Sequence, residues 1–285
     1  MQLDRSWKES ELITRLARHS GGRKILSLVG PRYIEKNLGA FTLLLDLQDR
    51  WGVSKYILRH GNYDPDICEM IEKTIAPGAV CLDIGANIGF WSNFLATKCK
   101  AKTVIAIEPE PENFALLQYN VELNRNQSKV KRFNCAVGAE PSKLKLFLSK
   151  DNAGDHQLYA SGESRESVEV DVKRVDDLVG DQKIDFIKMD VQGYEPFVLQ
   201  GMTELFERNS QVKILTEFWP KGIRAAGADP EEMLKFFTHR KFRFHFFNES
   251  RRCWQESDAV GLLRDLPEGH HIDLLMSRSQ IIERG

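Results

Sequence analysis

The chain has 285 residues, of which 42% are hydrophobic and 28% are charged. This composition is typical of a globular protein and excludes global disorder, and the length accommodates one large domain with an appendage. Lys and Arg together number 40 and Asp and Glu number 41, which gives a formal net charge of −1. Because no overall positive charge attracts the chain to a phosphate backbone, we expect no nucleic-acid partner.

Cysteine usage and hydropathy predict a cytoplasmic protein. The cysteines are odd in number, widely spaced and without a C-x-x-C pair, so neither a disulfide framework nor a zinc knuckle is expected. No apolar run approaches the ~18 residues of a membrane span, and the first residues lack the pattern of a signal peptide. The five cysteines are Cys68, Cys81, Cys99, Cys135 and Cys253.

The first 76 residues have a helical pattern. Apolar residues recur at helical spacing in residues 12–17, and a second apolar group follows in residues 25–29 after a Gly-Gly break. Asp64-Pro65-Asp66 is typical of a helix start, and Ile67 to Ile75 carry apolar residues on one face. We therefore predict an N-terminal helical cap over residues 1–76, through which a homodimer could form.

From Val80 onward, short apolar strands alternate with amphipathic helices, which is typical of a doubly wound α/β domain with a mostly parallel sheet and helices on both faces. We assign residues 77–285 to this domain. The runs 143–148 and 167–175 alternate apolar and polar residues and predict an inserted antiparallel β-hairpin. The other expected strands are 80–84, 103–107, 130–137, 186–189, 212–218, 243–247 and 271–276, and the expected helices are 88–98, 111–124 and 195–206.

The first strand ends in an acid and a glycine-containing loop, Asp83-Ile-Gly85-Ala86-Asn87-Ile-Gly89. Glycine allows a tight turn and close approach to a ligand, and open α/β sheets bind ligands at this edge. The spacing differs from the G-x-G-x-x-G dinucleotide fingerprint, and no G-K-[ST] phosphate loop follows. An ordinary strand-to-helix turn is the structural alternative.

Two further strands end in acids at the same predicted edge. Glu108 follows the second strand, where a carboxylate can accept hydrogen bonds from ribose hydroxyls. Its alternative role is a helix N-terminal acid before Pro109 and the helix at 111–124. Asp190 ends the strand at 186–189 and alternatively caps the turn that follows. The three acids Asp83, Glu108 and Asp190 therefore converge on one crevice.

In this order, the segments Asp83–Gly89, Ile107–Phe114, Cys135–Gly138 and Asp185–Glu195 resemble the FkbM family of S-adenosylmethionine-dependent methyltransferases. The resemblance covers roughly residues 56–220. It implies a class I Rossmann-like sheet of seven strands with a final antiparallel strand, and O-methylation of a sugar-like or secondary-metabolite hydroxyl. The cofactor-binding residues that it implies are Tyr63, Asp83, Gly85, Ala86, Asn87, Gly89, Glu108, Pro109, Cys135, Ala136 and Asp190.

A hydroxyl is a weak nucleophile at neutral pH, so a base would assist methyl transfer. Asp190 is the best candidate by position. His156 lies on the loop of the predicted hairpin and has a suitable ordinary pKa, but an exposed loop histidine is an equal alternative. Glu217 ends the strand at 212–218 and is expected to accept a hydrogen bond from the substrate hydroxyl, with a structural strand-end carboxylate as the alternative.

Two other functions compete with this interpretation. An NAD-dependent oxidoreductase would share the α/β domain, but the glycine spacing and the lack of a Tyr-x-x-x-Lys pair disfavour it. A non-catalytic cofactor-binding regulator is the other alternative. We expect no metal ion, because histidine pairs at ligand spacing are missing. The polar residues of the predicted hairpin loop favour a hydroxylated, sugar-like small molecule as the acceptor.

Overall fold

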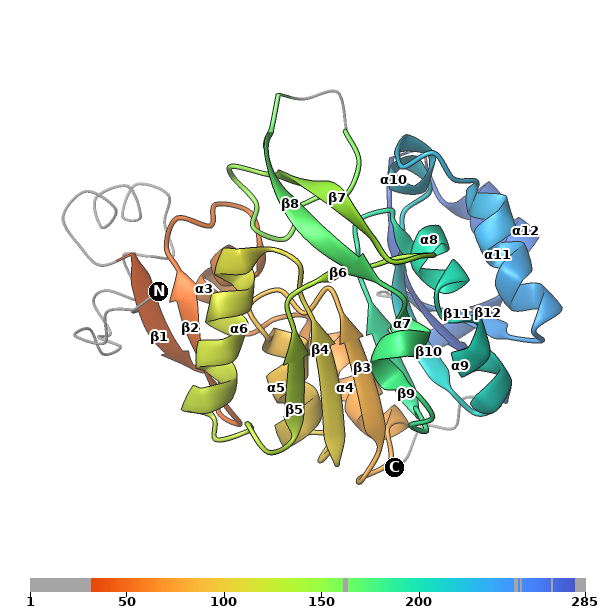
Figure 1. Ribbon diagram of the computed structural model, residues 1–285. Helices are drawn as coiled ribbons and strands as arrows, with labels where there is room; N and C mark the ends of the chain where they lie inside the picture. The colour runs from red at the N-terminus through yellow and green to blue at the C-terminus, as the bar shows by residue number, and fades with distance from the viewer. Residues whose placement is uncertain (1–31, 161–163, 249–250, 252, 268, 280–285) are drawn as a thin grey trace.

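The computed structural model describes residues 32–160, 164–248, 251, 253–267 and 269–279. Within these residues, the largest sheet has eight strands in the order β12-β11-β13-β10-β9-β3-β4-β5 (Figure 1). Its strands are β3 (Val80–Ile84), β4 (Thr103–Ile107), β5 (Val130–Phe133), β9 (Phe186–Met189), β10 (Lys213–Phe218), β11 (Arg243–Asn248), β12 (Cys253–Ser257) and β13 (Ile272–Ser277).

The five central strands are parallel, and β13 pairs antiparallel with β10. The parallel strands are apolar and almost wholly buried, as expected for a sheet covered on both faces. The mostly parallel α/β sheet with a reversed late strand is therefore confirmed. It has one more strand than the seven expected, because the polar segment between β11 and β13 contributes the edge strand β12.

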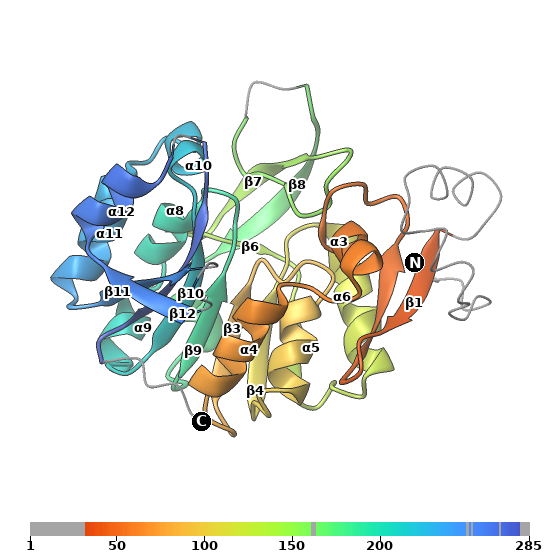
Figure 2. The same ribbon diagram turned by 180° about the vertical axis from the view of Figure 1, so that it is seen from behind.

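Helices cover both faces of this sheet. One face carries α4 (Pro65–Thr74), α5 (Phe90–Thr97) and α6 (Pro111–Leu123), with α4 and α5 in front of the sheet in Figure 2. The core on the opposite face contains residues of α7 (Val175–Val179), α8 (Glu195–Gln200), α9 (Thr203–Arg208), α10 (Pro220–Ala225), α11 (Pro230–His239) and α12 (Ala259–Asp265). No helix in the described ranges is long and apolar enough to cross a membrane.

The prediction of a wholly helical N-terminal cap is wrong for residues 33–46. These residues form an antiparallel hairpin of β1 (Tyr33–Asn37) and β2 (Thr42–Asp46), followed by α3 (Val53–His60). The amides of Asn120 on α6 and of Asn124, its C-cap, bond the backbone of Leu44 and Thr42, so the free edge of β2 is satisfied by side chains. The predicted helices within residues 12–29 lie outside the described residues, and the boundary at residue 77 stays a prediction.

A second, three-stranded sheet of order β6-β8-β7 stands above the carboxyl ends of the parallel strands (Figure 1). Its strands are β6 (Ala136–Val137), β7 (Ser142–Leu148) and β8 (Glu166–Lys173), and β7 and β8 pair antiparallel. The strand predicted at 130–137 is thus divided between two sheets. At the break, the Asn134 amide donates to the carbonyls of Glu108 and Pro109.

Candidate active site

A cavity of about 590 Å³ lies where the carboxyl ends of β3, β4, β9 and β10 meet the second sheet and the segment from Trp51 to Asp64. Its size is that of a small-molecule site. The position at the carboxyl edge of an open parallel sheet is the one at which α/β folds bind ligands.

The loop after β3 has two structural reasons for its glycines. Gly85 and Gly89 have positive φ angles of 79° and 87°. A Cβ on Gly85 would lie 1.9 Å from the carbonyl oxygen of Asp190, and one on Gly89 would lie 2.7 Å from Leu117 Cδ1. The N–H groups of Gly85 and Ala86 both donate to the carbonyl of Ile107. Gly85 therefore lines the cavity together with Ala86, whereas Gly89, also predicted to contact the cofactor, does not line it and packs against Leu117.

Asn87 occupies a left-handed conformation with φ of 50°, which asparagine tolerates better than most residues. Its backbone N–H donates to Glu108 Oε2 at 2.7 Å, and its Nδ2 donates to the carbonyl of Ala153 at 2.8 Å. Asn113 Nδ2 donates to the same carbonyl at 2.9 Å. Asn87 therefore ties the β3 loop to the segment Asn152–Gly154, which we call the strap.

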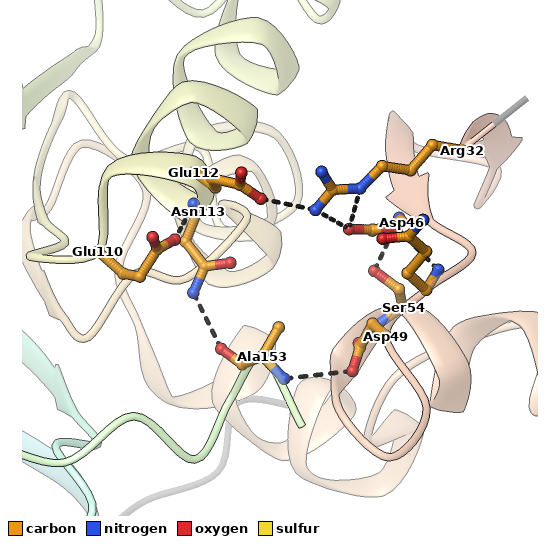
Figure 3. A network of polar contacts seen from close by, with 9 residues as sticks. Arg32, Asp46, Asp49, Ser54, Glu110, Glu112, Asn113 and Ala153 are labelled. Atoms are coloured by element: carbon orange, nitrogen blue, oxygen red, sulfur yellow. Dashed lines mark hydrogen bonds and ion pairs between the residues drawn. The ribbon is translucent and has the colours of Figure 1, made fainter. Parts of the chain in front are cut away.

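The strap is fixed from the other side as well (Figure 3). Ala153 N–H donates to Asp49 Oδ1, and the backbone N–H of Asn113 donates to the helix-capping Glu110 carboxylate. In the same network, Arg32 bonds both Asp46 of the hairpin and Glu112 at the start of α6. Three segments that are distant in sequence thus form one roof over the cavity.

Glu108 lines the cavity and is 5% exposed. Its Oε2 accepts from Asn87 and its Oε1 from the backbone of Glu110. Burial raises the pKa of this carboxyl to about 8. Each oxygen has a second acceptor site, so the pair of hydroxyls of a ribose would fit here.

Asp83 does not line the cavity, contrary to the expectation that it contacts the cofactor. Its side chain is buried behind the β3 loop, where Oδ2 accepts from Ser92 Oγ at 2.6 Å. Burial raises its pKa to about 6, and Oδ1 has no hydrogen-bond partner among the described residues. The structure assigns this strand-end acid a position one layer below the cavity.

The remaining predicted cofactor residues line the two ends of the cavity. Pro109, Cys135 and Ala136 form an apolar end next to Glu108, as a flat purine would require. Burial raises the pKa of the Cys135 thiol to about 11, so it is unreactive at neutral pH. Tyr63 lies at the opposite end and packs edge-on against Phe90 with ring centroids 5.0 Å apart.

Asp190 lines the cavity but both of its oxygens are occupied. Lys188 Nζ lies 2.9 Å from Oδ2, and Gln192 Nε2 donates to Oδ1 at 2.8 Å. Burial favours the neutral acid, but the ammonium of Lys188 outweighs it and holds the pKa of Asp190 below its usual range. The expectation that Asp190 is the best base is therefore not supported, because a low pKa makes a weak base.

Glu217 has the opposite character. Burial, followed by repulsion from Asp190, raises its pKa well above the ordinary value. Its Oε1 lies 3.5 Å from His271 Nε2, and its Oε2 is 3.4 Å from Gln192 Nε2. Of the three predicted catalytic residues, Glu217 is the one whose pKa is raised, as a proton-accepting carboxylate requires.

His156 lines the cavity as a hydrogen-bond donor. Its Nδ1 accepts from the backbone N–H of Ser149 at 3.0 Å, which places the proton of the neutral ring on Nε2. Burial lowers its pKa to about 4. A ring that is neutral with its lone pair engaged is a poor base, so the predicted proton-accepting role of His156 is not supported.

Several cavity residues were missed from the sequence: Trp51 and Tyr56 from the N-terminal segment, Ala153 and Gly154 of the strap, Lys188, His271 and Asp273. The strand-end position of Lys188 was a usable signal, whereas no local pattern marks the others. Among the described residues, no cluster of three or more His, Cys, Asp or Glu could hold a metal ion.

A mostly parallel sheet with the reversed strand β13 beside its parallel centre, a strand-end acid suited to a ribose and a cavity above it define a Rossmann-like class I methyltransferase fold. The model of the methyltransferase FkbM domain matches residues 83–244, which is more than half of the chain. The chain therefore belongs to the FkbM methyltransferase family, and its cofactor is S-adenosylmethionine. This membership disfavours the NAD-dependent alternative.

The chain is similar in sequence to several named methyltransferases. Methyltransferase 1 of Beauveria bassiana is 30% identical over 145 residues, 43% of this chain and 58% of the relative. The 31-O-demethyl-FK506 methyltransferase FkbM of Streptomyces tacrolimicus is 27% identical over 162 residues, 46% and 62% of the two chains. The hexuronic acid methyltransferase AglP of Haloferax volcanii is 24% identical over 186 residues, 62% and 69%.

The match to the first of these relatives spans less than two thirds of that protein. Among solved structures, methyltransferase FkbM from Methylobacillus flagellatus superimposes with a TM-score of 0.46 at 17% identity, covering 76% of this chain and 46% of the other.

Proposed function

We propose that this chain is an O-methyltransferase that transfers the methyl group of S-adenosylmethionine to a hydroxyl of a small, sugar-like or secondary-metabolite acceptor. The observation that carries the proposal is Glu217, a carboxylate with a raised pKa that lines the cavity beside Asp190. The names of two relatives, which act on an oxygen of FK506 and on hexuronic acid, support a hydroxylated acceptor.

Each part of the cavity has a role in this proposal. Bound S-adenosylmethionine supplies an electrophilic methyl group on a sulfonium. Glu108 would accept hydrogen bonds from the ribose, and Cys135 and Ala136 would flank the adenine. The strap would exclude water and hold the acceptor in line, which accounts for much of the rate of such displacements. Glu217 would take the proton of the acceptor hydroxyl at a carboxylate oxygen.

The test is methyl transfer from isotope-labelled S-adenosylmethionine to a panel of methyl glycosides, hydroxylated macrolides and phenols. We expect labelled ether products from wild type, and from Glu207→Gln, which changes an exposed glutamate on α9. We expect a loss of about 10²- to 10⁴-fold in Glu217→Gln, the range of a general base. Label found only on nitrogen would contradict the proposal. If the protein binds the cofactor but labels no acceptor, the proposal is also contradicted, and a non-catalytic regulatory protein is favoured.

A further inference from the structure

Bulky apolar side chains exposed to solvent gather at the mouth of the cavity. Among the described residues, the large exposed hydrophobic side chains are Trp51 at 71%, Tyr56 at 37% and Val260 at 71%. Trp51 and Tyr56 line the cavity, whereas Val260 is on α12 and does not. Exposed aromatic residues beside a small-molecule cavity are typical of a ligand-binding surface.

The backbone that carries Trp51 is held in place before any ligand arrives. The N–H groups of Arg50 and Trp51 donate to the carbonyl of Asp151, next to the strap, at 2.9 and 3.0 Å. Asp49 accepts from the backbone of Gly52 at 2.8 Å and of Ser54 at 2.9 Å. The indole therefore projects from a rigid turn, and a preorganised surface loses little entropy on binding.

The aromatic surface continues inward. Tyr56 packs edge-on against Tyr63 with ring centroids 5.4 Å apart, and Tyr63 lines the same cavity. Trp51 and Tyr56 form what we call the aromatic wall, and Tyr63 joins this wall to the predicted cofactor residues. Polar groups of the strap and the His156 ring lie elsewhere on the cavity lining.

This lining selects among acceptor chemistries. A ring with an apolar face and several hydroxyls on its edge can stack on the wall and accept from His156 Nε2, whereas a phenol offers a single hydroxyl for such bonds. The inner end carries the carboxyl groups of Asp64, Asp190, Glu217 and Asp273 around the single ammonium of Lys188. An anionic acceptor would be repelled there.

On the basis of the proposed function, we propose that the aromatic wall is the acceptor subsite and that it takes the apolar face of an uncharged pyranose ring, which stacks on Trp51. The acceptor would thus be a neutral sugar or glycoside rather than a uronic acid or a phenol.

The test is saturation-transfer NMR on the full chain saturated with S-adenosylhomocysteine, with methyl β-D-glucopyranoside, its glucuronide analogue and p-cresol as separate probes. We expect saturation of the axial ring protons of the neutral glucoside and a weaker response from the glucuronide. Trp51→Ala should weaken glucoside affinity about tenfold, the upper range of a stacking contact, and Trp51→Phe should restore part of it. Val260→Ala, which truncates an equally exposed side chain away from the cavity, should change nothing.

The outcomes separate this inference from the proposed function. Three results would overturn the inference and leave the proposed methyl transfer unaffected, provided that S-adenosylhomocysteine binds. They are no response from the glucoside, unchanged glucoside affinity in Trp51→Ala, and preferred binding of p-cresol or the glucuronide. Failure to bind S-adenosylhomocysteine would overturn the proposed function first. Because Trp51 is exposed, its variants should keep the wild-type melting temperature, and thermal unfolding checks that they do.

Discussion

At the scale of single residues, two carboxylates in one cavity differ in their affinity for protons. Asp190 forms an ion pair with Lys188 and stays ionised, whereas Glu217 is half-buried beside Asp190 and holds its proton more tightly. Environments that separate the pKa values of neighbouring acids assign them different roles. We therefore assign Asp190 to positioning Lys188 and Gln192, and Glu217 to proton transfer.

This assignment predicts the pH profile of methyl transfer. Only ionised Glu217 can accept a proton, so kcat/KM should rise with pH through an apparent pKa well above 4.5. The rising limb should vanish in Glu217→Gln and remain in Asp190→Asn, whatever the overall rate of the second variant. A limb lost in Asp190→Asn and kept in Glu217→Gln would reverse the two roles.

Glu108 predicts how the stability of the cofactor-free protein depends on pH. Its folded pKa of about 8 exceeds the ordinary value of 4.5, so the folded state binds more protons between these values. The stabilisation is complete below 4.5 and is lost as the pH rises through about 8. Between pH 5 and 8, Glu108→Gln should remove part of this decline, by about 1–3 kcal/mol. Urea unfolding at each pH measures the free energy of unfolding. If this free energy falls equally with pH in wild type and Glu108→Gln, the raised pKa of Glu108 is refuted.

At the scale of elements, the hairpin of β1 and β2 depends on α6. Asn120 is wholly buried, and its side chain replaces a strand partner for Leu44. Asn120→Ala should lower the free energy of unfolding by about 2–3 kcal/mol, because a buried backbone N–H loses its acceptor. Gln118→Ala, at an exposed position of the same helix, is the matched control. Equal stability of the two variants would mean that the hairpin does not need this contact.

The same scale shows what sequence patterns could and could not predict. The strands 80–84, 103–107 and 186–189 were predicted with their observed bounds, because a buried parallel strand is a short apolar run. The helix expected at 195–206 is divided into α8 and α9 at Gly201 and Met202. Glycine is required at this break, because a Cβ at Gly201 would lie 2.0 Å from the carbonyl oxygen of Gly138. That contact joins segments that are distant in sequence, so the helical periodicity of residues 195–206 could not predict it.

The hairpin at 33–46 was missed for a related reason. The run of apolar residues in β2 is too short to distinguish a strand from a buried helix, and the residues that satisfy its edge lie on α6. Local periodicity therefore could not decide the structure of this segment.

At the scale of the whole molecule, the topology brings the strand-end acids to one edge, so the location of the site could be predicted. Its roof could not, because the strap meets Asp49, Asn87 and Asn113 through contacts between remote segments. The roles of Asp190 and His156 also needed the structure, since their pKa values depend on burial and on Lys188 and Ser149. Residue types at the strand ends predicted where the site lies, and the packing around each side chain determines which groups can accept or donate a proton there.

The measurement that tests the account most directly is calorimetric titration of the full chain with S-adenosylhomocysteine, with NAD titrated in parallel and Glu108→Ala as the variant. We expect one molecule of S-adenosylhomocysteine to bind per chain with micromolar affinity, at least about tenfold weaker binding in the variant, and no heat from NAD. Binding of NAD in place of S-adenosylhomocysteine, or equal affinity in Glu108→Ala, would contradict the assignment of this cavity to the methyl donor.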